Sequence, residues 1–359
     1  MSELEKLLIA LCRIPAPSGS EQARADFICS WFREQGCAAF CDEAGNVLLP
    51  LGAQDGDLVI VAAHTDTVFS DTEPLQPECR GTRLYCPGAG DDTANLAILM
   101  FAARDLCRSG KMPKIGILFA ADVCEEGLGN LAGCRALMER FGARVREFVS
   151  FDLYRDRVYS RAVGSARYRI TLRCKGGHSF GDFGSKSAIH AAAELVCALY
   201  AQTAPQGGKV TWNVGTVEGG TTVNAIAEEA TLTYEYRSDS AACMEEMERS
   251  FRRILAAVQD AEVKCETLGV RPGMGSCRDS ARQEDLIRRA ERALTAAFGE
   301  APQRDMASTD CNIPFSLGIP SVCFGLIEGG GVHTRGEYVE LGSLVPGLAA
   351  AKQFLESYF

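Results

Sequence analysis

The chain alternates short apolar segments with amphipathic ones, and this alternation is the feature that most constrains its fold. Residues 58–63 form an apolar run typical of a buried strand, and residues 92–106 carry their apolar side chains on one helical face. The same patterns predict a strand at 114–121, a helix at 128–141 and a strand at 147–152. Strands that alternate with helices favour a mixed, mostly parallel sheet with helices on both faces.

A different pattern interrupts this alternation after about residue 164. It predicts a strand, a helix, two strands, a helix and a strand, at 165–174, 186–202, 209–217, 229–237, 242–258 and 262–268. This βαββαβ order is that of the ferredoxin-like split unit. The β/α character resumes from about residue 283, with a helix to 298, a strand at 321–324 and a closing helix from 345. We therefore expect an outer domain at 1–164 and 281–359 and an inserted domain at 165–280.

Two capping-box patterns predict helices near the N-terminus. Ser2 to Glu5 precedes an apolar run, and Ser18 to Glu21 precedes a segment that Gly36 can end.

Composition excludes several classes of protein. A net charge of −10 without a basic run disfavours nucleic acids and anionic membranes as partners. The N-terminal residues lack a signal-peptide pattern, and no apolar stretch is long enough to span a bilayer. The 16 cysteines are scattered and do not form the paired C-x-x-C motifs of a structural zinc site. This favours reduced thiols. We therefore expect a cytoplasmic protein.

Two of the four histidines and three acidic positions follow predicted strands or Gly-rich segments. They are His64, the pairs Asp91–Asp92 and Glu125–Glu126, Asp152, and His333. Because parallel strands end at one edge of a sheet, most of these side chains should converge there. A lone His64 would fit a buried core position as well as a metal site, but the complete array favours a metal-dependent hydrolase.

The chemistry of such a site requires both ligands and a free base. Imidazole and carboxylate groups bind zinc, and two ions about 3.5–4 Å apart can share one carboxylate. A further carboxylate must carry the proton to the leaving amine. The spacing does not decide which member of Asp91–Asp92 is a ligand, or which member of Glu125–Glu126 is the base. Asp66 can face the same side as His64 and accept a hydrogen bond from its second ring nitrogen.

At this point the sequence resembles the co-catalytic zinc peptidases that include peptidase T, carboxypeptidase G, aminoacylase and succinyl-diaminopimelate desuccinylase. The resemblance covers nearly the whole chain. It rests on HTDTV (64–68), GAGDDTANLA (88–97), CEEGLGN (124–130), FDLY (151–154), GGHSF (176–180), GGTTVNAIAEEATLTYEYR (219–237) and GGGVHTRGEYVEL (329–341). It implies a catalytic domain of the zinc-exopeptidase type, with the insert as a lid and dimerisation domain.

The resemblance also implies a role for each site residue. Asp91 would bridge two divalent metal ions, zinc in the first place, with manganese or cobalt as alternatives. His64 and Asp152 would complete one metal site, and Glu126 and His333 the other. Glu125 would be the general base, and Asp66 would orient His64.

In the inserted domain, the resemblance implies three further functional residues. His178 would reach the active site of the partner in a homodimer and stabilise the oxyanion. Asn224 and Arg237 would contact the substrate, Arg237 through a carboxylate. Two segments depart from the family pattern: residues 92–95 after the bridging acid, and residues 179–184 after His178. These departures affect the expected substrate preference, not the metal site.

The sequence thus predicts an exopeptidase that hydrolyses short peptides, di- or tripeptides, through a dizinc-bound hydroxide with Glu125 as the base. The alternative is an N-acyl or N-carbamoyl amino acid amidohydrolase of the aminoacylase type. A remote alternative is a non-catalytic scaffold with the same fold.

Overall fold

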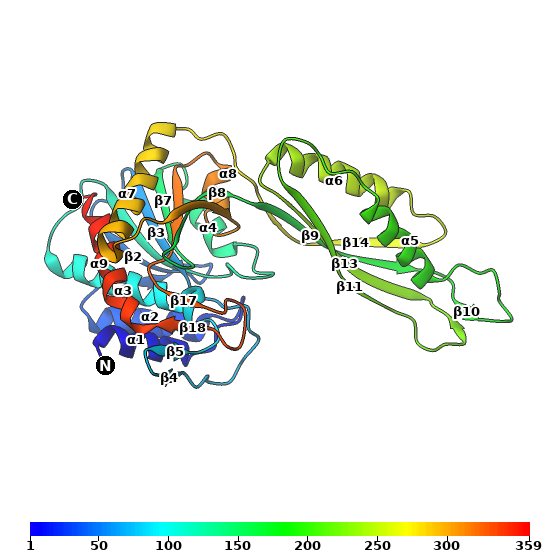
Figure 1. The fold of residues 1–359 in the computed structure, drawn as a ribbon, viewed down its shortest axis with the longest axis horizontal. Helices are drawn as coiled ribbons and strands as arrows, with labels where there is room; N and C mark the ends of the chain where they lie inside the picture. The colour runs from blue at the N-terminus through cyan, green and yellow to red at the C-terminus, as the bar shows by residue number, and fades with distance from the viewer. The chain divides into compact units, whose positions relative to one another are not determined.

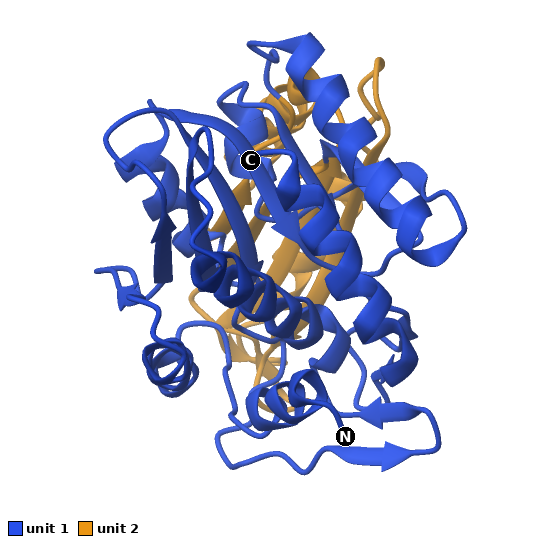
Figure 2. Ribbon diagram, turned by 90° about the vertical axis from the view of Figure 1, so that its left-hand side faces the viewer, with its two compact units in different colours: residues 1–162, 275–359 blue, residues 163–274 orange.

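The computed structural model describes residues 1–359, which form two compact units. The first unit comprises residues 1–162 and 275–359, and the second comprises residues 163–274 (Figure 2). The predicted insert, residues 165–280, overlaps the second unit.

The first unit is built on an eight-stranded sheet with the strand order β1-β2-β6-β3-β7-β16-β8-β15. Its central strands are parallel, because β3 pairs in parallel with both β6 and β7, and β16 pairs in parallel with β7. Its strands are β1 (Phe40–Cys41), β2 (Val47–Leu51), β3 (Leu58–His64), β6 (Gly116–Asp122), β7 (Val145–Phe151), β8 (Arg157–Ala162), β15 (Gln303–Ala307) and β16 (Ser321–Phe324). The predicted mixed, mostly parallel sheet is confirmed.

Helices cover both faces of this sheet, which explains why every residue of β3 and β6 is buried. Alternate β3 residues, Val59, Val61 and Ala63, join one core cluster with α1, α2, α3, α7 and α9. The intervening residues face the other layer, in which α4 and α8 contact each other. The helices are α1 (Glu3–Cys12), α2 (Gln22–Glu34), α3 (Ala94–Ser109), α4 (Ala132–Phe141), α7 (Ser280–Phe298), α8 (Asn312–Ser316) and α9 (Leu344–Glu356) (Figure 1).

A small sheet that the sequence analysis did not predict joins distant parts of the first unit. Its order is β17-β18-β5-β4, from β17 (Gly329–Gly330), β18 (Tyr338–Glu340), β5 (Arg83–Tyr85) and β4 (Glu78–Arg80). A short 3-10 turn, η2 (Leu341–Ser343), follows β18. The pairing of β18 with β5 brings the segment before α3 next to the segment that contains His333.

Two of the expected helix starts are different in the structure. The predicted capping box of Ser2 and Glu5 is present. The predicted capping box of Ser18 and Glu21 is absent, so that prediction was wrong. Helix α2 begins after Glu21 without a side-chain cap, because the Ser18 hydroxyl donates to Asp66 instead. Helix α4 begins at Ala132 rather than at residue 128, since Asn130 and Leu131 adopt positive φ angles.

The second unit is a four-stranded antiparallel sheet in the order β11-β13-β9-β14. Its elements follow in the order β9 (Gly164–Arg173), β10 (Gly177–His178), α5 (Ala188–Tyr200), β11 (Val210–Gly219), β12 (Ala225–Ile226), β13 (Glu229–Ser238), α6 (Ala241–Ala256) and β14 (Glu262–Arg271). Helices α5 and α6 pack on one face of this sheet and form a core of their own with it (Figure 1). Apart from the short β10–β12 ladder, this is the predicted βαββαβ order.

None of the helices combines the length and the apolar composition that a membrane span requires.

Candidate metal centre

Five of the predicted site residues converge at one edge of the large sheet. His64 is the last residue of β3, Asp152 follows β7, and Glu125 and Glu126 lie in the loop after β6. These three strands are parallel neighbours, so their carboxyl ends lie side by side. Asp91 comes from η1 (Ala89–Thr93), the π-helical turn before α3.

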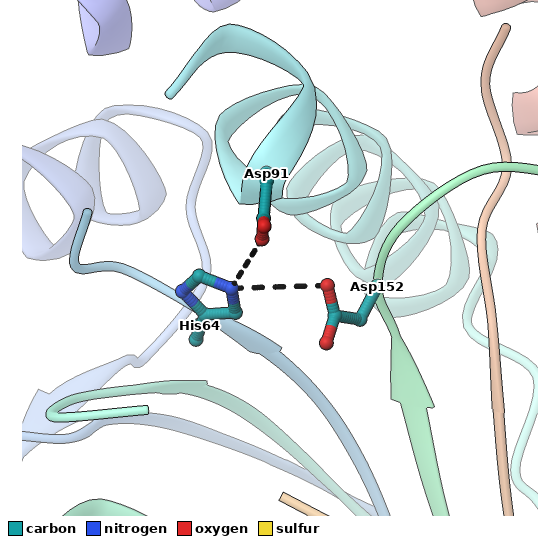
Figure 3. Close-up of side chains that lie close together, drawn as sticks. All are labelled: His64, Asp91 and Asp152. Atoms are coloured by element: carbon teal, nitrogen blue, oxygen red, sulfur yellow. Dashed lines mark hydrogen bonds and ion pairs between the residues drawn. The ribbon is translucent and has the colours of Figure 1, made fainter. Parts of the chain in front are cut away.

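The first group of metal-ligand atoms consists of His64, Asp91 and Asp152. Nε2 of His64 lies 3.0 Å from Oδ1 of Asp91 and 3.8 Å from Oδ1 of Asp152 (Figure 3). All three residues are buried, and one ligand atom from each lies within 4.8 Å of the others.

The second group consists of Asp91, Glu126 and His333, and their ligand atoms also lie within 4.8 Å of one another. Nε2 of His333 is 3.0 Å from Oε1 of Glu126 and 3.2 Å from Oδ2 of Asp91. The His333 side chain is 53% exposed, whereas that of His64 is 1% exposed. One group is therefore deep, and the other opens to solvent through His333.

Asp91 is the residue that the two groups share. Its Oδ1 faces His64 and its Oδ2 faces His333, as a bridging carboxylate requires. Asp92, joined to it by a cis peptide bond, accepts a hydrogen bond from Asn95 at 2.7 Å and belongs to neither group. The geometry therefore favours Asp91 over Asp92 as the shared ligand.

Asp66 is completely buried and contacts residues of both groups. Its Oδ1 is 3.5 Å from Nδ1 of His64, and its two oxygens accept the backbone amides of Glu125 and Glu126, each at 2.9 Å. The Ser18 hydroxyl donates to the same carboxylate at 2.6 Å. Nδ1 of His64 is nearer to the backbone carbonyl oxygen of Asp66, at 3.1 Å, than to the carboxylate that was predicted to orient it. Asp66 also fixes the loop of the two glutamates, which the sequence did not reveal.

Glu125 lies beside the metal-ligand atoms and is buried. One of its carboxylate oxygens is within 4.8 Å of ligand atoms of His64 and Glu126. This proximity is compatible with a proton carrier next to the metal ions and also with a further ligand.

Opposite charges dominate the electrostatics of the centre. Burial lowers the pKa of His64, but hydrogen bonds to Asp66 and Asp91 raise it well above its ordinary value. Hydrogen bonds to Asp91 and Glu126 raise the pKa of His333 to about 10. Burial raises the pKa of Asp91, but the hydrogen bonds from His333 and His64 bring it below its ordinary value. The surrounding carboxylates thus favour a positive charge at both imidazoles.

The donor set fits divalent metal ions. Both groups offer nitrogen and oxygen ligands, which zinc, manganese and cobalt accept. Oδ1 of Asp152 is buried and has no hydrogen-bond partner, and burial followed by the charge of Asp91 raises the pKa of this carboxyl. Because a buried carboxylate without a partner is costly, a bound cation would satisfy it.

Two residues of the centre were missed by the sequence analysis. Ser18 was interpreted as a helix cap, and Glu337 carried no motif of its own. Glu337 is buried and accepts backbone hydrogen bonds from Gly88, Gly90 and Asp91. Its signal in the sequence was its place in the GGGVHTRGEYVEL motif, four positions after His333.

The remaining predicted residues lie in the second unit. Nδ1 of His178 accepts the backbone amides of Phe180 and Gly181, each at 3.2 Å. The backbone carbonyl of Asn224 accepts a hydrogen bond from the backbone amide of Ser179 at 3.1 Å, so Asn224 lies close to the His178 turn. Arg237 lies near the C-terminal end of β13 and forms an ion pair with Glu235 at 3.1 Å. Their roles stay predictions.

The fold and the two ligand groups define a metallopeptidase-type hydrolase. The model of peptidase family M20/M25/M40 matches residues 60–357, and the chain belongs to this family. The predicted resemblance is thereby confirmed.

Curated relatives of the chain include succinyl-diaminopimelate desuccinylases. That of Verminephrobacter eiseniae (strain EF01-2) is 24% identical over 260 residues, which cover 67% of this chain but only 63% of the relative. That of Ralstonia nicotianae is 26% identical over 328 residues, which cover 84% of this chain and 82% of the relative. A tripeptidase structure from Staphylococcus aureus has a TM-score of 0.79 and 21% identity, with 99% of this chain and 97% of that chain covered. This last likeness shows the shared fold.

Proposed function

We propose that the protein is a metal-dependent exopeptidase that hydrolyses the amide bond of di- or tripeptides with two divalent ions, zinc in the first place. The observation that carries this proposal is the position of Asp91, whose two oxygens face the imidazoles of two separate ligand groups. A scaffold protein without activity would have no need for this arrangement or for a buried Glu125 beside it.

We assign each side chain of the centre a role that its position supports. His64, Asp91 and Asp152 would hold one ion, and Asp91, Glu126 and His333 the other. When bound, such ions polarise the scissile carbonyl and make water a better nucleophile at neutral pH. The Glu125 carboxylate accepts the proton of the attacking water and returns it to the nitrogen of the leaving amine. Asp66 keeps His64 and the Glu125 backbone in place.

The second unit would complete the site in a homodimer. We infer that Nε2 of His178 acts at the partner's active site, since backbone amides already occupy its Nδ1. Asn224 and Arg237 would contact the substrate, with Arg237 exchanging Glu235 for a substrate carboxylate. The 16 free cysteines support a cytoplasmic location, where thiols stay reduced.

A second candidate function is hydrolysis of N-acyl or N-carbamoyl amino acids. The curated desuccinylase relatives favour it, because their name denotes removal of an acyl group from an amino acid.

One substrate panel distinguishes the candidates. The purified protein, loaded with zinc, manganese or cobalt, is offered matched substrates with a free or a blocked amine. Chelator-sensitive cleavage of free dipeptides or tripeptides is the expected result. Cleavage of the N-blocked compounds alone would replace the peptidase by the amidohydrolase, and cleavage of neither, without bound metal, would favour the scaffold.

A further inference from the structure

Glu337 connects the two loops that carry Asp91 and His333. Its side chain is fully buried, and its carboxylate accepts three backbone hydrogen bonds from the loop before α3. The donors are Gly88 at 3.0 Å, Gly90 at 2.7 Å and Asp91 at 2.8 Å. Three backbone hydrogen bonds therefore hold the Glu337 side chain against this loop.

Glu337 also belongs to the segment that presents His333. It lies four residues after this histidine and directly before β18, and its own carbonyl accepts a hydrogen bond from Cys86 at 3.1 Å. His333 has a φ of 60°, which is unusual for a residue other than glycine. The loop conformation around His333 therefore depends on external contacts, and Glu337 supplies those that lead to Asp91.

The carboxylate has little freedom to move. A Cβ atom added to Gly90 would lie 3.2 Å from Oε1 of Glu337 and 2.9 Å from the hydroxyl of Tyr154. The Tyr154 hydroxyl is itself buried without a hydrogen-bond partner, so it closes this space without competing for the carboxylate. A glutamine at position 337 would turn an amide group toward three amide donors and could not accept all of their hydrogen bonds.

We propose that Glu337 is a positioning residue that fixes the distance between Asp91 and His333 and thereby sets the affinity of the second metal ion. This inference rests on the proposed function, since it assumes that the centre holds two ions. The first group should depend on Glu337 less, because His64 and Asp152 are held at the ends of β3 and β7. Residues that orient metal ligands commonly change metal affinity about 10- to 100-fold when they are replaced.

The test is a calorimetric titration of the full-length protein with Zn²⁺ after removal of metal by a chelator. Glu337→Gln is compared with wild type and with Glu340→Gln as the matched control. Glu340 lies on the same segment but pairs with Arg83 and Thr82, away from the ligand groups. We expect two tight sites in wild type and in Glu340→Gln. In Glu337→Gln, one site should keep nearly the wild-type affinity and the other should weaken about 10- to 100-fold.

Glu337→Asp provides the conservative comparison and replaces Glu337→Gln if the latter lacks the wild-type circular dichroism. It keeps the carboxylate on a shorter side chain and should weaken the same site while the first site keeps nearly the wild-type affinity. Two wild-type affinities in both the Gln and the Asp variant would overturn the inference alone, as would an equal loss at both sites. A wild-type protein that binds no metal would overturn the proposed function as well.

Discussion

The carboxylate of Asp66 accepts the backbone amide of Glu125 at 2.9 Å, and so a residue next to one histidine ligand also controls the position of the proposed base. The other oxygen of Asp66 accepts the amide of Glu126, a ligand of the second group. Both groups therefore depend on one buried carboxylate. Burial raises the pKa of Asp66, but the hydrogen bonds from His64, Ser18 and the Glu126 amide outweigh this effect. The pKa therefore lies below its ordinary value, which favours the charged form.

Replacement of Asp66 by Asn should lower kcat/KM about 10- to 100-fold, because an amide cannot accept all of these hydrogen bonds. Asp57→Asn is the control, since Asp57 forms an ion pair with Arg146 at 2.8 Å on the surface and has no contact with the ligand groups. Steady-state kinetics of both variants, with metal content measured in parallel, provide the comparison. If both variants kept wild-type kinetics, Asp66 would have no part in organising the centre.

Replacement of Glu125 should remove proton transfer, whereas replacement of Glu126 should remove a metal ligand. Glu125→Gln should lower kcat about 10²- to 10⁴-fold while two metal ions remain bound, because only proton transfer is lost. Glu126→Gln should lose the second ion, because Oε1 of Glu126 is one of its three candidate ligands. Metal analysis after gel filtration separates these results. The reverse pattern, with metal lost from Glu125→Gln, would exchange the two roles.

The sequence predicted those parts of the centre that follow from regular secondary structure. His64 and Asp152 could be predicted because His64 ends, and Asp152 follows, a strand with a clear apolar pattern. Asp91 could not be separated from Asp92, since the choice depends on which carboxylate reaches both histidines. Glu337 accepts hydrogen bonds from backbone amides of a distant loop, and the Ser18 hydroxyl donates to the Asp66 carboxylate and the Glu126 carbonyl. No local sequence pattern records such contacts. The β17-β18-β5-β4 sheet was missed because its strands are only two or three residues long.

Metal binding at pH 7 should release protons. The pKa of His333 is raised to about 10, chiefly by Asp91 and Glu126, and that of His64 also lies well above its ordinary value. Both imidazoles must lose a proton before they can bind metal, so binding of two ions should release about two protons or more. The apparent affinity should accordingly fall as the pH is lowered.

Titrations in buffers of different ionisation enthalpy measure this proton release. His190→Gln is the control, because this exposed histidine lies on α5 and has only Glu194 near it, at 3.5 Å. The control should release as many protons as wild type, and His333→Gln should release fewer. Metal binding without any proton release at pH 7 would contradict the charged state of both imidazoles.

Arg237→Ala should raise KM for substrates with a free carboxylate more than for the corresponding amides. The guanidinium lies in the second unit and has Glu235 as its partner, so a substrate carboxylate could replace that partner. Arg173→Ala offers a matched control, because Arg173 is another arginine of the same sheet that pairs with a glutamate, Glu229, at 2.7 Å. Equal changes of KM for acids and amides would remove Arg237 from carboxylate recognition.

Asp122 and Asp310 form a buried carboxyl pair whose protonation should affect stability. Neither side chain is exposed, and no other group donates a hydrogen bond to their four oxygens. Burial raises the pKa of Asp122 to about 6, and burial together with the charge of Asp122 raises that of Asp310 well above its ordinary value. A carboxyl group whose pKa rises on folding stabilises the fold below its unfolded pKa of about 4. This stabilisation is lost as the pH rises through the folded pKa.

The melting temperature of the metal-free wild type should therefore fall between pH 5 and pH 8 relative to that of Asp310→Asn, in which an amide can donate to Asp122 without a shared proton. Asp305→Asn is the control, because Asp305 is a partly exposed aspartate that pairs with Arg157. Its melting curve should follow that of wild type across this pH range. If the Asp310→Asn and wild-type curves ran parallel from pH 5 to pH 8, the two carboxyls would not hold a shared proton in the folded chain.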